Sequence, residues 1–117
     1  MKGYIKLHRK MTEWEWYKDI PTKTLYIHLL LKACWSDFTY RGMQIPSGTV
    51  VTTVRELTEE TRLSPQQIRT ALSHLKSTNE ITTKSTNKLT LIHIEKWGIY
   101  QCDEERINEA VNRVFNK

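Results

Sequence analysis

The chain is poor in the residues from which catalytic and metal sites are built. Its 117 residues include four glycines, all separated, so no glycine-rich loop is available to cradle a phosphate. The four histidines stand apart from one another and from any cysteine or carboxylate at metal-ligand spacing. We therefore expect no enzyme, no metal site and no cofactor.

Long hydrophobic runs are also missing. No stretch approaches the roughly 20 apolar residues of a membrane span, and no apolar core follows the basic N-terminus, so no signal peptide is expected. Cys34 and Cys102 are far apart and form no metal or redox motif. A reducing, cytoplasmic setting is the simplest expectation, with Cys34 as a buried free thiol inside a helix.

Positive charge is what the chain has in excess, and it is unevenly distributed. The formal net charge is +5. Residues 61–97 carry six Lys or Arg against two acids, and residues 1–36 carry seven against three. A phosphate-binding surface needs such asymmetry, although basic proteins without a nucleic-acid role are common. At this length we expect one domain that buries roughly 65% of its unfolded surface.

Residues 63–94 form the most informative segment, and its first part, residues 63–77, predicts a well-capped amphipathic helix. Ser64 is a good N-cap, Pro65 suits the first helical position, and Gln67 can reach back to complete a capping box. One face of this helix is apolar at helical spacing. Its residues are Ile68, Ala71, Leu72 and Leu75.

The opposite face of this helix is polar and contains no acid. Its centre consists of Gln66, Thr70, Ser73 and Ser77, flanked by Gln67, Arg69, His74 and Lys76. Side chains of these kinds hydrogen-bond to base edges and phosphates. The alternative is the solvated polar face of an ordinary surface helix. His74 is the one histidine that we expect at a DNA surface.

A short helix is predicted just before this one. Thr53 and Glu56 form a second capping-box pattern at its start, and a tight turn follows in which Leu63 is expected to be buried. Two helices joined so closely are typical of a helix-turn-helix, whose second helix enters the major groove. Glu59 and Glu60 must then point away from the duplex.

Two segments rich in β-branched residues, 80–84 and 88–94, follow the helix and predict strands. Asn79 suits the left-handed position just past a helix. The turn between the strands can contact phosphates or reach the minor groove, although edge hairpins also carry lysines merely to block aggregation. The tip consists of Lys84, Ser85, Thr86, Asn87 and Lys88.

A polar, basic helix followed at once by a basic hairpin is typical of a winged helix-turn-helix. We therefore predict an α+β fold over residues 1–101, with a three-helix core, a β-hairpin wing and an N-terminal extension. Within it, residues 4–8 are expected to form a short strand, and a central helix is expected from near Pro21 to about Trp35. Loops around a short strand are expected over residues 41–48.

Two further segments of the chain carry apolar side chains that we expect to be packed against other residues. Trp14, Trp16 and Tyr17 form a cluster that is expected in the core, with self-association as the alternative. Residues 102–117 predict a C-terminal amphipathic helix whose first turn is acidic, which suits the helix dipole. We favour its packing on the same domain, or pairing in a homo-oligomer, over a linker, because Ile107 and its apolar neighbours would otherwise face water.

The chain resembles a known family over about residues 3–101. It is similar to the N-terminal domain of phage replisome organiser proteins, which are related to the winged-helix domain of DnaD-type replication initiation proteins. This resemblance implies a winged-helix fold and a role in recruiting replication proteins, such as a replicative helicase or helicase loader, to an origin. Family members often have Gly where this chain has Asn79, and they usually carry a second, C-terminal domain. The matching segments include Trp14-Glu15-Trp16-Tyr17-Lys18-Asp19, His28-Leu29-Leu30-Leu31-Lys32-Ala33, Arg69-Thr70-Ala71-Leu72, Thr86-Asn87-Lys88 and Trp97 with Tyr100-Gln101.

Three functions follow as hypotheses. The first is double-stranded DNA binding in phage or prophage replication initiation. The second is a winged-helix transcriptional regulator with the same contacts, which only the family resemblance disfavours. The third is a protein–protein interaction module without DNA binding, which predicts no salt-sensitive binding to a duplex. The residues expected at the DNA are Gln66, Gln67, Arg69, Thr70, Ser73, His74, Lys76, Lys84, Ser85, Thr86, Asn87 and Lys88.

Overall fold

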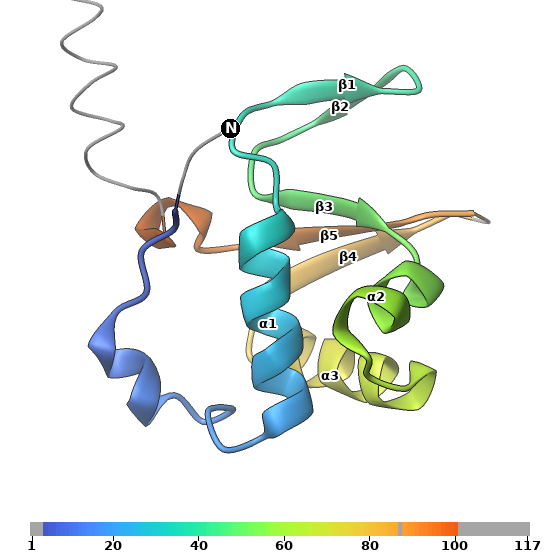
Figure 1. Ribbon diagram of the computed structural model, residues 1–117. Helices are drawn as coiled ribbons and strands as arrows, with labels where there is room; N and C mark the ends of the chain where they lie inside the picture. Colours follow the sequence, from blue (N-terminus) through green and yellow to red (C-terminus); the bar gives the residue numbers. More distant parts are fainter. Residues whose placement is uncertain (1–3, 87, 101–117) are drawn as a thin grey trace, which may run out of the picture.

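Helix α1, Ile20–Lys32, is the central element of a mixed α+β fold (Figure 1). The computed structural model describes residues 4–86 and 88–100, so Asn87 and the predicted helix over residues 102–117 lie outside the described chain. Asp19 caps α1, since its Oδ1 accepts a hydrogen bond from Thr22 N at 3.1 Å. No helix of the described residues is long and apolar enough to cross a bilayer.

The end of α1 differs from the prediction, because the helix stops at Lys32 rather than near Trp35. Cys34 exchanges backbone hydrogen bonds with the start of a strand, since its N–H donates to Thr49 O and its carbonyl accepts from Gly48 N. Those bonds hold the chain in an extended path. Cys34 is therefore a half-buried free thiol outside the helix, and its expected place inside the helix is wrong.

Strands β1, Phe38–Tyr40, and β2, Met43–Ile45, form a separate antiparallel hairpin. Arg41 and Gly42 make its two-residue turn, with φ angles of 48° and 79°. Sequence analysis predicts loops around a short strand in this region and misses the hairpin. The usual residues at the first turn position are Asn, Asp and Gly, so an arginine there gives no hairpin signal.

Helices α2, Val54–Thr61, and α3, Pro65–Ser77, begin and end as their caps predict. The α3 capping box is complete, with Ser64 Oγ accepting from Gln67 N and Gln67 Oε1 accepting from Ser64 N. At α2 only half of the predicted box forms, because the Glu56 carboxylate accepts the Thr52 hydroxyl at 3.2 Å. Leu63, in the turn between the helices, is half-buried against the core.

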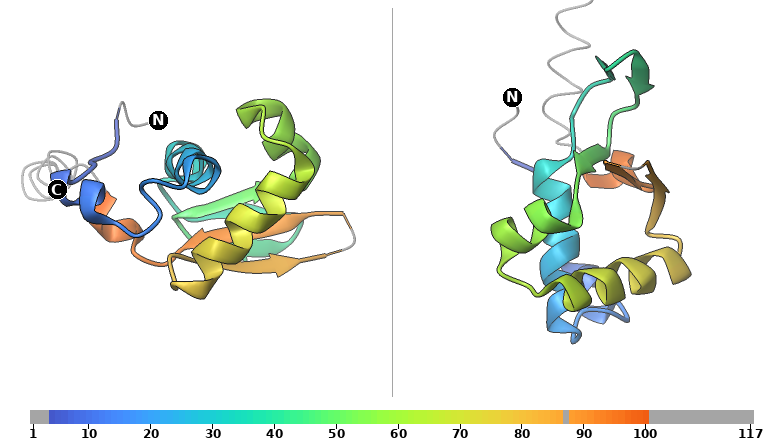
Figure 2. Two further views of the ribbon diagram at one scale, coloured as in Figure 1. Left: turned by 90° about the horizontal axis from the view of Figure 1, so that it is seen from below. Right: turned by 90° about the vertical axis from the view of Figure 1, so that its right-hand side faces the viewer.

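The main sheet contains β3, Thr49–Thr52, β4, Ile81–Ser85, and β5, Thr90–Ile94, in the antiparallel order β3-β5-β4. Figure 1 and the right panel of Figure 2 show α3 below this sheet and the β1–β2 hairpin above it. The apolar face predicted for α3 is buried against the sheet and α1. The core includes Leu25, Leu29, Leu57, Ile68, Leu75, Ile81, Ile92 and Ile94.

The N-terminal segment covers one side of this core. The strand predicted over residues 4–8 is wrong, because those residues have no regular secondary structure and no described strand pairs with them. A 3-10 helix, η1, follows over Arg9–Glu13, and a second, η2, covers Trp97–Tyr100. Trp14 packs on Tyr26 with ring centroids 5.0 Å apart, as the core alternative for the aromatic cluster predicts.

Candidate nucleic-acid interface

The outward side of α3 is exposed, polar and free of acids. We call it the α3 polar face, and it consists of Gln66, Arg69, Thr70, Ser73, Lys76 and Ser77, all of which are exposed. Gln66 Nε2 donates to Thr70 Oγ1 at 3.3 Å, one turn further along. The helix contains no Asp or Glu, so nothing on it repels a phosphate.

Two cations on the α3 polar face are unpaired. Within residues 4–86 and 88–100, neither Arg69 nor Lys76 makes an ion pair or a side-chain hydrogen bond. Their charged groups therefore keep their hydrogen-bond donors for solvent or for a ligand. An arginine fork can bind two acceptors at once, as on a guanine edge or a phosphate.

His74 is turned away from this face toward the start of α1, so the structure does not bring it together with the other predicted DNA contacts. Its ring stacks on Trp16, with centroids 4.3 Å apart and an angle of 6° between the planes. Its Nδ1 lies 2.9 Å from Thr22 Oγ1 and 3.3 Å from Asp19 Oδ2. These contacts hold the ring against the start of α1, where Thr22 and Asp19 supply hydrogen-bond partners in place of solvent.

Gln67 is exposed but partly committed to the fold. Its Oε1 accepts the Ser64 backbone N–H at 2.9 Å in the capping box. Its amide group therefore keeps its N–H donors for a ligand, while its oxygen is occupied. The contact expected between Gln67 and DNA stays a prediction, limited to donation from Nε2.

The position of His74 also fixes which way Arg69 and Lys76 point. At about 100° per residue, both lie roughly 150° around α3 from His74. His74 faces α1, so Arg69 and Lys76 face away from it. The left panel of Figure 2 shows the β4–β5 hairpin on that other side of α3. The structure thus brings the two α3 cations to the side where the hairpin lies.

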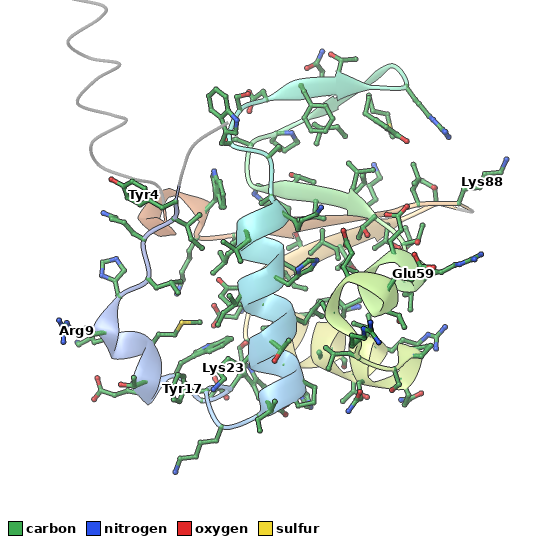
Figure 3. All side chains as sticks on the ribbon, viewed as in Figure 1. Tyr4, Arg9, Tyr17, Lys23, Glu59 and Lys88 are labelled. Carbon is green, nitrogen blue, oxygen red and sulfur yellow. The ribbon has the colours of Figure 1, made fainter. Side chains whose placement is uncertain are left out.

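The hairpin tip projects from the body of the molecule. Lys84, Ser85, Thr86 and Lys88 are all exposed, and Figure 3 shows Lys88 at the outer end. The tip is held by Thr86, whose N–H donates to Leu89 O at 2.8 Å and whose Oγ1 accepts from Leu89 N. Neither lysine is paired with another described residue.

The acids that flank α3 in the chain are turned to other partners. Glu60 accepts from His28 Nε2 at 3.2 Å and lies 3.1 Å from Lys32 Nζ, both on α1. The hydrogen bond from His28, with help from Lys32, lowers the pKa of the Glu60 carboxyl. Glu80 accepts from Trp14 Nε1 at 3.2 Å. Glu60 therefore points toward α1.

Glu59, another acid of α2, is neutralised by a neighbouring cation. Glu59 pairs with Arg55 one helical turn away at 3.3 Å, and Figure 3 shows it on the exposed side of α2.

Arg62 is a further cation, which the sequence predicts only as part of the turn between α2 and α3. Arg62 is exposed beside the start of α3, in a left-handed conformation with φ of 66°, and it adds a cation there that pairs with no acid among residues 4–86 and 88–100.

Two further observations concern metal ligands and hollows among the described residues. No three His, Cys, Asp or Glu side chains of residues 4–86 and 88–100 gather where they could hold a metal ion. A hollow of about 960 Å³ is lined by η1, Trp14, Glu80 and Lys96, and its walls carry cations and acids together. No protein-family model, curated protein or solved structure matches the chain.

Proposed function

We propose that this protein binds double-stranded DNA as a winged helix-turn-helix. In this arrangement α3 enters the major groove, α2 crosses the backbone, and the β4–β5 hairpin is the wing. Arg69, Gln66, Thr70 and Ser73 would meet base edges, while Lys76 and the hairpin lysines hold phosphates. His74 is left out of this set because its ring packs against α1.

One observation carries the proposal: the α3 polar face has no acid, and its two cations, on the hairpin side, pair with no acid in the described part of the chain. A structural surface helix commonly neutralises its cations with acids one turn away, as Arg55 and Glu59 do on α2. Unpaired lysines and arginines along one side instead favour a polyanion, because each phosphate contact releases a condensed counterion. Glutamine, serine and threonine between them supply donors and acceptors for bases.

We further propose that the DNA contact serves replication initiation in a phage or prophage, with a helicase or helicase loader as partner. This part rests on the resemblance to phage replisome organisers. A transcriptional regulator would use the same residues on DNA. Recovery of a replicative helicase or its loader with the tagged protein supports replication, and recovery of RNA polymerase subunits instead supports transcription.

Duplex affinity measured over a salt series tests the DNA contact. Each lost phosphate contact should flatten the slope of log affinity against log salt by about 0.9, so Lys84→Ala/Lys88→Ala should lose about 1.8. Arg69→Ala should cost about 1–3 kcal/mol on a preferred site and relax specificity there. Arg9→Ala is the matched control, because Figure 3 shows Arg9 on the opposite side of the molecule from Lys88.

The same experiment can reject the proposal. If the unmodified protein binds duplex without salt dependence, or if all variants bind as it does, the α3 polar face is not a DNA surface. The hypothesis of a protein–protein interaction module without DNA binding is then favoured.

A further inference from the structure

Two hairpins project on the same side of the molecule. Both Figure 1 and the right panel of Figure 2 show the β1–β2 turn above the β4–β5 tip, with both ends directed alike. A hollow of about 400 Å³ lies between β2 and the side of the β4–β5 hairpin that faces away from α3. Duplex binding by α3 and the β4–β5 tip makes no use of the β1–β2 hairpin and shares only Lys84 with the lining of the hollow.

The lining of this hollow suits a phosphate backbone. The lining contains no acid, Lys84 brings an ammonium group to it, and Gln44 Nε2 donates to Thr39 Oγ1 at 3.1 Å with one of its two N–H groups. The Thr82 hydroxyl, also in the lining, donates to Glu95, which is outside the lining. His93 is held in place by Thr49, whose Oγ1 lies 3.0 Å from His93 Nδ1.

Arg41 adds a cation at the open end of the β1–β2 hairpin. It occupies a left-handed turn position, φ 48°, where Asn, Asp or Gly is usual, so the turn itself does not favour arginine. Its guanidinium carbon lies 5.3 Å from the centroid of the Tyr40 ring. No acid of the described residues pairs with Arg41. A charged residue kept in an unfavourable backbone conformation indicates a use for the charge.

We infer that Arg41 and this hollow bind a second phosphate backbone of the duplex, on the side of the β4–β5 hairpin opposite α3. The inference rests on the proposed function. A hairpin tip lodged in a minor groove, which is about 6 Å wide, has a sugar-phosphate strand on each side. The side of the β4–β5 hairpin that faces α3 contacts one DNA strand. The β1–β2 hairpin contacts the other DNA strand, which is thus held between the two hairpins.

Arg41→Asn tests this inference because asparagine tolerates the left-handed turn and removes only the charge. On a duplex of about 20 base pairs, the salt slope should flatten by about 0.9 for the lost phosphate contact. Arg41→Lys should restore the slope, since lysine also contacts a phosphate. Arg9→Asn makes the same change on the opposite side of the molecule and should leave the slope unaltered. Thermal unfolding of each variant verifies that the fold is intact.

The outcomes separate the two proposals. If Arg41→Asn keeps the full slope while Lys88→Ala, at a residue outside the lining of the hollow, flattens it, the second backbone contact is rejected and DNA binding by α3 and the wing stands. If Arg9→Asn flattens the slope as much as Arg41→Asn, the effect is one of net charge and the inference is also rejected. If the unmodified protein has no salt-dependent affinity for duplex, both proposals fall together.

Discussion

His74 connects two helices through one imidazole ring. Its Nδ1 reaches Thr22 and Asp19, and its ring covers Trp16. Asp19 is also the N-cap of α1. Trp16 Nε1 donates to Thr78 Oγ1 at 3.0 Å, just past the end of α3. This cluster joins the start of α1 to the last turn of α3, and it sets the rotation of α3 about its own axis.

His74→Ala should therefore reduce stability rather than weaken the phosphate contacts. We expect a loss of about 1–3 kcal/mol, since the change removes an aromatic contact and leaves the buried Thr22 hydroxyl without a partner. Urea unfolding measures it, with exposed Ser73→Ala as a neighbour expected within about 0.5 kcal/mol of the unmodified protein. Full stability combined with a flatter salt slope would return His74 to the DNA surface.

At the scale of elements, Glu60 joins α2 to α1 through His28 and Lys32. Its pKa is lower in the folded protein than the ordinary value of 4.5, chiefly because of the hydrogen bond from His28. A carboxyl with a lowered pKa adds stability above its unfolded pKa and loses it as the pH falls through the folded pKa.

Glu60→Gln should accordingly destabilise the protein at pH 7, and the difference from the unmodified protein should shrink on acidification below pH 4.5. Denaturant unfolding at neutral and acid pH measures both quantities. Glu59→Gln is the matched control, because its exposed pair with Arg55 should contribute about 0.5 kcal/mol or less. A difference that is constant over the whole pH range would mean that the carboxylate charge is not what matters at position 60.

Elements with local signals could be predicted from the sequence, and those defined by distant contacts could not. The bounds of α3 follow from Ser64, Pro65 and Gln67, which lie within its first turn. The end of α1 depends instead on bonds from Cys34 to a strand that starts fifteen residues later, at Thr49. The β1–β2 turn has an arginine where a local signal would have needed asparagine or glycine.

In the candidate site, too, the features set by local spacing could be predicted from the sequence, and those set by distant contacts could not. Helical spacing alone predicts which α3 side chains are exposed, and the structure agrees for Arg69, Thr70 and Ser73. Spacing cannot tell which flank of the helix meets another element. His74 is turned toward the start of α1, which spacing could not reveal because its partners, Trp16 and Thr22, are more than fifty residues away in sequence.

At the scale of the whole molecule, several elements meet at Gly48. Its N–H donates to Cys34 O beyond α1, its carbonyl accepts from Ile94 N of β5, and Trp97 of η2 lies over it. Its φ is +83°, and a Cβ placed there would lie 2.6 Å from Trp97 Cγ. The position therefore needs glycine both for its backbone conformation and for its space.

Gly48→Ala should cost more than about 1 kcal/mol, because alanine is strained at this φ and would also displace the Trp97 ring. Thermal unfolding measures the loss. Gly42→Ala is the control, since its φ of +79° imposes the backbone cost while a Cβ there meets nothing within 4 Å. Equal losses in the two variants would show that Trp97 moves aside at no cost.

The β1–β2 hairpin is closed at its base, where Ser47 N donates to Asp37 Oδ1 at 2.8 Å, and its strands form a sheet of their own. The length of the β1–β2 hairpin is therefore independent of the main sheet, β3-β5-β4. Two extra residues in each strand would keep the same side chains facing outward and carry the turn about 7 Å further, at about 3.4 Å per residue. Lineages or protein engineers could thus adjust the span of this appendage by insertion alone, without repacking the hydrophobic interior.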